Sequence, residues 1–351
     1  MTRRCWTWIV LISIFVLMPL TAGLFVASVC SRPGVSAPPP LLEVKCPRYS
    51  VFAFSPDSRL VAIDRSDRVE VYDLEERHAP MAVVWTQNWI ILSLSFTPDS
   101  RNLLIESDGK ILEFDATTGG TVGTIEIPGR YVEFVSCSAT AERAVAIVDN
   151  DRSKPFNEAE RGTESALGFN LREPATYQTL FTCNARGTRP IKFSRDGRLA
   201  VGCDLTSLTL KIWDTSNWSV KFERPAEGCR AFSLDSDARF VAWTNEFDRR
   251  CFVWSLEENR QLEEWKTGAT IRSLEFHSSG DLVYVENHSV FMQPLGGLLV
   301  VRDSHGQTKA RCRLTDGRFN SMALSRDGRF IGASGDGGVR IWRWEDLAKA
   351  K

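Results

Sequence analysis

The sequence is poor in the residues on which most enzymes and metal sites depend. Its 351 residues include only four histidines, at positions 78, 277, 288 and 305, and none lies at ligand spacing from a cysteine or a second histidine. There is no Cys-x-x-Cys, no Gly-x-Ser-x-Gly and no glycine-rich loop of the kind that cradles phosphate. We therefore expect no enzyme, no cofactor and no metal. A hydrolase whose two carboxylates come from distant segments is the enzymatic alternative.

An excess of charge of either sign is also missing. Lys and Arg number 43 and Asp and Glu 44, which gives a formal net charge of -1. Without an overall basic surface, a nucleic-acid partner is not expected. Seven of the nine cysteines are spread over residues 41–344. We interpret them as small apolar core residues, and the sequence does not pair any disulfide.

One long apolar run stands out, near the amino terminus. Residues 6–29 carry no charge, and as a helix they would extend about 36 Å, enough for the roughly 30 Å hydrocarbon core of a bilayer. Arg3 and Arg4 precede the run, and Arg32 is the one basic residue close behind it. This asymmetry predicts a transmembrane signal-anchor, with a cytoplasmic tail at 1–5 and the rest of the chain on the opposite side of the membrane.

Two alternatives compete with the signal-anchor. A cleaved signal peptide, with its cleavage region near Leu20–Gly23, would release the protein to the periplasm or the medium. Lipid modification of Cys30 is the other alternative. In either case residues 30–40, rich in proline and small side chains, predict a partly extended linker ahead of the folded part.

The folded part is built on an internal repeat. Short apolar runs lead into variants of Phe-Ser-Pro-Asp-Gly-Arg that begin at Phe54, Phe96, Phe193, Phe232, Phe276 and Leu324, and a degenerate copy begins at Phe134. Successive copies are 42, 38, 59, 39, 44 and 48 residues apart, a mean of 45. Alternating β-formers such as Val69–Tyr72 lie between turn-forming Asp, Asn, Ser and Gly. Spacing and pattern together predict the four-stranded blades of an all-β propeller.

The second half of each unit resembles the tryptophan-aspartate (WD) repeat. Its third strand closes on an aromatic residue followed by Asp or a polar substitute, at Tyr72-Asp73, Phe114-Asp115, Trp213-Asp214, Trp254-Ser255 and Trp342-Arg343. The Gly-His pair of such repeats is absent, so TolB-like or YVTN-type propellers are the near alternative. The resemblance covers about 41–344 and implies a seven-bladed β-propeller, followed by a C-terminal tail at 345–351.

The closure of the ring is predicted from its two ends. After Trp342 few residues remain for the outer strand of a last blade, whereas Leu41–Lys45 is a surplus strand-like segment ahead of the first innermost strand. Pairing the two would remove exposed sheet edges. We therefore expect residues near 41–46 to lie beside Val339–Trp342.

The expected function follows from the loops. In WD-repeat propellers partners dock on the face formed by loops that lead into the innermost strands and loops that join the second and third strands. The resemblance thus implies a non-catalytic scaffold for a protein partner, and the apolar run 6–29 predicts that this scaffold is membrane-anchored. A propeller that binds a small molecule or a glycan outside the cytoplasm is the alternative.

Candidate partner-binding residues lie in those loops. We call the first residue of each copy of the motif its anchor. Counting back four positions from each anchor places Arg130, Arg189 and Arg272 in one register, where they would suit a carboxylate or phosphate group of the partner. Trp89, ahead of the second unit, is a candidate aromatic anchor. Phe156 is the one aromatic residue of a polar insertion that lengthens the third unit between its second and third strands.

Overall fold

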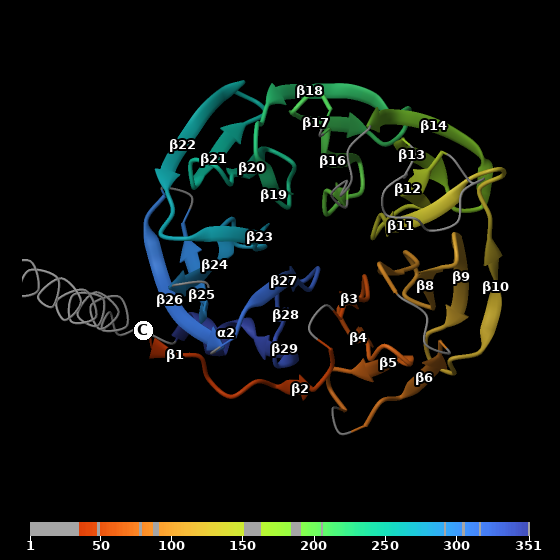
Figure 1. Ribbon diagram of the computed structural model, residues 1–351, viewed down its shortest axis with the longest axis horizontal. Coiled ribbons are helices and arrows are strands. Elements are labelled where there is room, and N and C mark those ends of the chain that lie inside the picture. The colour runs from red at the N-terminus through yellow and green to blue at the C-terminus, as the bar shows by residue number, and fades with distance from the viewer. Residues whose placement is uncertain are drawn as a thin grey trace, which may run out of the picture.

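Seven β-sheets arranged around a central axis form the protein (Figure 1). The computed structural model describes residues 35–47, 50–76, 79–86, 91–150, 163–183, 191–204, 206–290, 293–303, 306–315 and 317–349. Each sheet is one blade, and its innermost strand in the ring is β3, β7, β11, β15, β19, β23 or β27. The predicted all-β, seven-bladed propeller is therefore confirmed.

Blades 1 to 3 are antiparallel meanders. Blade 1 comprises β3 (Phe52–Phe54), β4 (Leu60–Asp64), β5 (Arg68–Asp73) and β6 (Ala82–Trp85). Blade 2 comprises β7 (Leu94–Phe96), β8 (Asn102–Ser107), β9 (Lys110–Asp115) and β10 (Thr121–Ile125). Blade 3 comprises β11 (Tyr131–Cys137), β12 (Arg143–Asp149), β13 (Glu164–Asn170) and β14 (Glu173–Cys183).

Blades 4 to 6 repeat this order. Blade 4 comprises β15 (Lys192–Phe193), β16 (Leu199–Asp204), β17 (Thr209–Asp214) and β18 (Ser219–Pro225). Blade 5 comprises β19 (Cys229–Leu234), β20 (Phe240–Asn245), β21 (Arg250–Ser255) and β22 (Arg260–Lys266). Blade 6 comprises β23 (Thr270–Phe276), β24 (Leu282–Val290), β25 (Gln293–Arg302) and β26 (Thr308–Thr315), with the short β1 (Val35–Ser36) added outside in parallel.

Blade 7 joins the two ends of the described chain. Its inner strands are β27 (Phe319–Leu324), β28 (Phe330–Gly335) and β29 (Gly338–Arg343), and its outer strand is β2 (Leu42–Val44). Leu42 pairs with Ile341 and Val44 with Val339, antiparallel. The predicted closure is confirmed, and it leaves Val44 only 4% exposed.

The repeated turn explains the sequence motif. In blade 1 the Ser55 hydroxyl donates to Asp57 and accepts from the Leu60 N–H at 2.8 Å, and the Arg59 N–H donates to Asp57 at 3.0 Å. Ser58 then has a φ of 63°, a left-handed conformation in which glycine is the residue of least strain. Gly197, Gly280 and Gly328 occupy this position in blades 4, 6 and 7.

Two of the seven predicted repeat anchors are displaced. The N–H after each anchor closes its turn, as the Ser55 N–H does by donating to Leu60 O. By this criterion Cys137 is the anchor of blade 3 in place of Phe134, and Leu234 is the anchor of blade 5 in place of Phe232. In both strands a phenylalanine two or three positions before the observed anchor matches the first residue of the motif.

The amino-terminal part of the described chain lies along the ring. Ala37 N–H donates to Arg313 O at 2.9 Å, and the Trp342 indole N–H donates to Pro38 O at 2.9 Å. Residues 35–40 therefore contact blades 6 and 7, whereas the composition predicted a spacer. At the other end, most of the predicted tail is helix α2 (Trp344–Lys349), whose Leu347 is buried.

Aromatic side chains fill the spaces between blades. Trp213 stacks on Phe181 of the preceding blade at a centroid distance of 5.9 Å, and Trp254 packs against Phe222 at 6.0 Å. Trp342 is fully buried. Trp218, which the sequence placed near the surface, is only 7% exposed because Gly168 of blade 3 leaves room for its ring.

Several predicted features lie beyond what the structure describes. The apolar segment 6–29, the tail 1–5 and Cys30 are outside the described residues. Within the described ranges, no helix has the length and apolarity needed to cross a bilayer. Four of the described cysteines, Cys203, Cys229, Cys251 and Cys312, are buried, in agreement with their interpretation as core residues.

Candidate functional site

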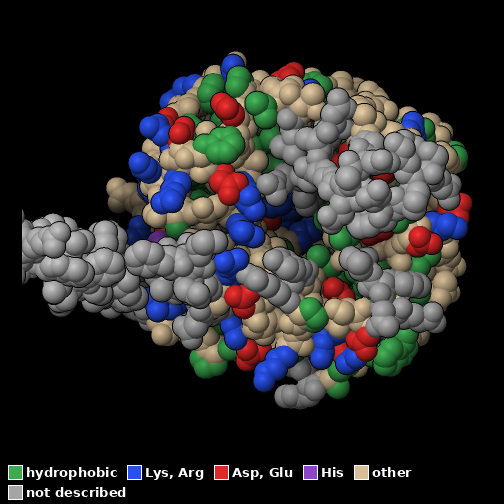
Figure 2. All heavy atoms as spheres, in the orientation of Figure 1, with side chains coloured by type: hydrophobic (Ala, Val, Ile, Leu, Met, Phe, Trp, Pro, Cys, Tyr) green, Lys and Arg blue, Asp and Glu red, His purple; other side chains and the backbone are tan. Residues whose placement is uncertain are grey.

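The axis of the ring is an open channel. A cavity of about 560 Å³ is lined by the innermost strands and their turns from all seven blades. Figure 2 shows this opening, with Lys and Arg side chains inside it and at its edge over β23 and β27. We call the face with the loops leading into the innermost strands the upper face, and the opposite one the lower face.

The upper mouth of the channel carries two arginines. Arg272 and Arg230 each lie four residues before their anchor, Phe276 and Leu234, and both line the cavity. Arg230 donates to Glu246 at 2.7 Å. The sequence predicted Arg272 at this position and missed Arg230, because the anchor of blade 5 was misplaced.

Arg130 does not belong to this ring. With Cys137 as the anchor of blade 3, Arg130 lies three positions too early in the chain and is not among the residues that line the cavity. Its guanidinium instead donates to Asn150 Oδ1 at 2.7 Å and lies 6.0 Å from the Tyr177 ring centroid. The prediction that Arg130 shares a register with Arg272 is therefore wrong.

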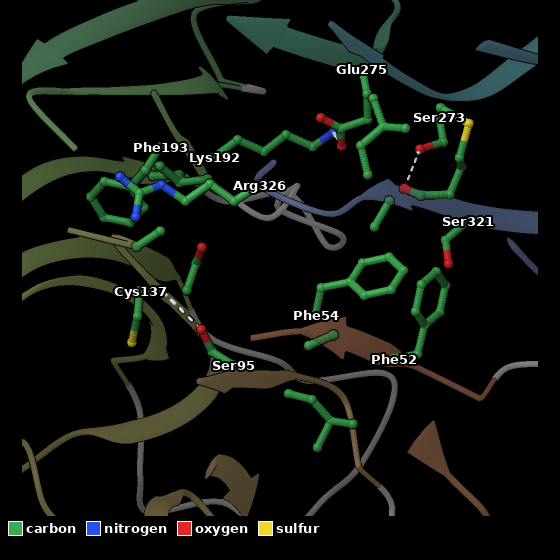
Figure 3. Close-up of a pocket in the computed structure, with 18 of the residues that line it drawn as sticks. Phe52, Phe54, Ser95, Cys137, Lys192, Phe193, Ser273, Glu275, Ser321 and Arg326 are labelled. Carbon is green, nitrogen blue, oxygen red and sulfur yellow. Dashed lines mark hydrogen bonds and ion pairs between the residues drawn. The ribbon is translucent and has the colours of Figure 1, made fainter. Parts of the chain in front are cut away.

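The middle of the channel holds an ion pair. Lys192 Nζ lies 2.6 Å from Glu275 Oε1 and 3.2 Å from Leu274 O (Figure 3). The other residues one position before an anchor are small: Ala53, Ser95, Ser136, Ser233 and Ala323. Because these side chains leave the axis open, the long Lys192 side chain reaches past blade 5 to blade 6.

The lower rim carries two more cations. Arg195 and Arg326 occupy the same position in the turns of blades 4 and 7, and both are exposed and line the cavity. Figure 3 shows the Arg326 side chain extending in the direction of Phe193. Pro56, Ala139, Ser236 and Ser278 occupy this position in other blades.

An aromatic side chain stands out on the upper face. Phe247, in the loop between β20 and β21, is 76% exposed. It lies beside Gly228, where an added Cβ would be 2.6 Å from the ring, and next in sequence to Glu246, the partner of Arg230. Leu208, in the corresponding loop of blade 4, is 43% exposed. Large apolar side chains in such loops are typical of contact points for other proteins.

A buried carboxyl lies under the same face. Glu106, at the upper end of β8, accepts hydrogen bonds from the backbone N–H groups of Leu92 and Gly109, while its Oε2 atom has no partner among the described residues. Burial raises the pKa of this carboxyl to about 8, and the nearby charges of Glu133 and Asp108 act in the same direction.

The described part of the channel carries few groups suited to catalysis or metal binding. Glu275 is the one carboxylate among the described residues that line the channel, so this part of the molecule lacks the paired carboxylates of a typical glycoside hydrolase. Nor does any cluster of three His, Cys, Asp or Glu side chains there suit a metal ion.

Comparison with known proteins agrees with this geometry. Residues 310–343 match the family model described as WD domain, G-beta repeat. Over these residues the chain is similar to a WD repeat. The matched segment begins in β26, the fourth strand of the blade 6 meander, and ends with β29 of blade 7, so the sequence repeat is offset from the blade by one strand.

A solved structure shares the fold of this seven-bladed propeller. The β-propeller domain of Cps50 (Swd1) from Myceliophteria thermophila is 14% identical in sequence, with a TM-score of 0.65 over 87% of this chain and 99% of that one. A search of curated proteins found no match. WD-repeat propellers generally bind protein partners and are generally not catalytic.

The remaining predicted site residues of the propeller are not placed. Trp89, Arg189 and Phe156 lie outside the described residues, although the insertion that contains Phe156 does fall between β12 and β13. Of the residues that sequence reasoning missed, Phe247 carried a local signal, since it is an aromatic residue in a polar turn. Lys192 and Glu275 carried none, because they are 83 residues apart.

Proposed function

We propose that this protein is a non-catalytic scaffold whose propeller binds a protein partner on its upper face. The exposed Phe247 ring is the observation that carries the proposal. A solvated phenylalanine in a loop held by a rigid ring loses little conformational entropy when a partner covers it. Leu208 on the next blade extends the apolar contact, and Arg230 and Arg272 at the channel mouth favour acidic side chains at its border.

We further propose that residues 6–29 anchor the propeller to a membrane, with the amino terminus in the cytoplasm and the propeller outside it. The length of the uncharged run and the preceding Arg3 and Arg4 support this arrangement. Protease treatment of sealed cells would digest the propeller from outside only if this orientation is right. Extraction of the protein by alkaline carbonate would contradict the anchor.

The partner site is tested by matched substitutions in the full-length protein. Partners are captured from native membranes with the wild type, Phe247→Asp and Val220→Asp, and compared quantitatively. Val220 is 50% exposed on the outer strand β18, away from the upper face. A partner that binds the proposed site is lost with Phe247→Asp and retained with Val220→Asp. Equal capture by all three proteins would refute the site.

A further inference from the structure

The side chains that line the described part of the channel carry more positive than negative charge. Its described lining includes Lys192, Arg195, Arg230, Arg272 and Arg326 but a single carboxylate, that of Glu275. Many cations elsewhere on the surface are paired, for example Arg59 with Asp73 at 2.6 Å. A narrow opening lined by charges of one sign concentrates the electrostatic potential along its axis. Such a channel attracts anions.

The lower part of the channel holds the cations with the fewest partners. Arg195 and Arg326 form no ion pair with any described carboxylate, although Arg198 and Arg329, three residues later in the same turns, have Asp196 and Asp327 beside them. Two uncompensated guanidiniums in one cavity repel each other, and a bound anion would remove that repulsion.

These cations approach the axis from two blades, 4 and 7. Lys192 crosses from blade 4 to blade 6, where it meets Glu275. Arg195, also of blade 4, is close enough to blade 6 that its charge adds to the burial that lowers the pKa of His277. Arg326 comes from blade 7 and extends into the same cavity (Figure 3). A ligand on the axis would therefore be contacted from blade 4 and from blade 7.

We propose that the lower channel binds a small, multiply charged phosphate compound through Arg195, Arg326 and Lys192. A cavity of about 560 Å³ lies within the range of small-ligand sites, roughly 300–1,000 Å³. Guanidiniums donate paired hydrogen bonds to phosphate oxygens, and several phosphates on one molecule match several cations better than a single carboxylate does. This site is on the axis and is independent of the protein partner proposed for Phe247.

The test uses inorganic tripolyphosphate as the probe, titrated calorimetrically into the folded propeller at low ionic strength. Arg195→Ser and Arg326→Ser are combined in one variant, because serine occupies this position in blades 5 and 6, as Ser236 and Ser278. Arg198→Ser is the control, since its side chain is 86% exposed in the same turn and does not line the channel. We expect affinity to fall about tenfold or more in the double variant and to change by less than about twofold in the control.

A variant that should bind more tightly provides a second test, because a variant that merely loses structure would not gain affinity. Glu275→Gln removes the one described carboxylate of the channel and frees Lys192, so tripolyphosphate should bind several-fold more tightly. Higher salt should weaken binding in every variant. The proposal is overturned if the wild type does not bind tripolyphosphate, if the double variant binds it equally well, or if citrate binds as tightly.

Discussion

Lys192 and Glu275 connect two blades that are not neighbours in the ring. The Lys192 Nζ atom on β15 of blade 4 lies 2.6 Å from Glu275 Oε1 on β23 of blade 6, so the ion pair passes blade 5 on the channel side. Ser233 of blade 5 lies beneath the pair, with its hydroxyl 3.4 Å from Glu275 Oε2. A contact between non-adjacent blades restrains the ring against opening.

The first prediction concerns the energy of this pair. The two side chains are only 31% and 22% exposed, so their attraction is less screened than that of a surface pair. In a double-mutant cycle of Lys192→Met and Glu275→Gln, we expect a coupling of about 1 kcal/mol in the free energy of unfolding, measured in urea. Strictly additive effects would show that the pair contributes nothing.

The second prediction concerns ring closure by β2. Val44 is buried against blade 7 and its neighbours, so Val44→Asp places a charge in an apolar contact without a partner. We expect a loss of about 3 kcal/mol in the free energy of unfolding. Lys45→Asp at the adjacent exposed position should cost less than about 0.5 kcal/mol. If both variants unfold at the same denaturant concentration, β2 does not hold the ring closed.

The third prediction compares the same turn position in adjacent blades. Gly328 and Gly280 have φ angles of 79° and 84°, so alanine is strained at both by about 1 kcal/mol. At Gly328 an added Cβ would also lie 2.3 Å from Ser278 Oγ and 2.6 Å from His277 Nε2, whereas nothing lies within 4 Å at Gly280.

Gly328→Ala should therefore destabilise the protein by at least about 1 kcal/mol more than Gly280→Ala. The midpoints of thermal unfolding, measured side by side, give the comparison. The His277 Nε2–H donates to Gly328 O at 2.9 Å, so a crowded Gly328 also disturbs the contact between blades 6 and 7. Equal midpoints for the two variants would mean that the turn with Gly328 does not pack against the turn with His277 and Ser278.

The features that the sequence predicted correctly are local or periodic. The turn around Ser55 and Asp57 can be read from six consecutive residues because its hydrogen bonds span no more than five positions. Its repetition predicted the blades, and the strand missing after Trp342 predicted the pairing of Val44 with Val339. Each of these inferences needed only the identity of nearby residues or a count of strands.

The contents of the channel could not be predicted in the same way. Whether an arginine lies at the mouth depends on its distance from the anchor of its strand. The predicted anchor was two residues too early in blade 5 and three residues too early in blade 3, so the prediction missed Arg230 and included Arg130. The ion pair of Lys192 with Glu275 depends on small residues at the same level in other blades, such as Ala53. Such contacts arise from the closed ring and leave no pattern along the chain.

The fourth prediction concerns the buried carboxyl of Glu106, whose pKa is raised to about 8 by burial. In the unfolded chain this carboxyl has its ordinary pKa, near 4.5. Between these two values the folded protein holds a proton that the unfolded chain has released. The stabilising contribution is therefore complete below pH 4.5, decreases as pH rises toward 8, and is lost above that.

Glu106→Gln removes this dependence, because the amide stays neutral at every pH. From about pH 5 to pH 8 the wild type should lose stability relative to Glu106→Gln by up to about 1.4 kcal/mol per pH unit, with no further change above pH 8. Urea unfolding of both proteins at several pH values measures the difference, and Glu257→Gln in an exposed turn is the control. A difference that is flat from pH 5 to pH 8 would mean that Glu106 is already ionised in the folded propeller, and a loss of wild-type stability relative to Glu106→Gln as pH falls would mean that its folded pKa is lowered.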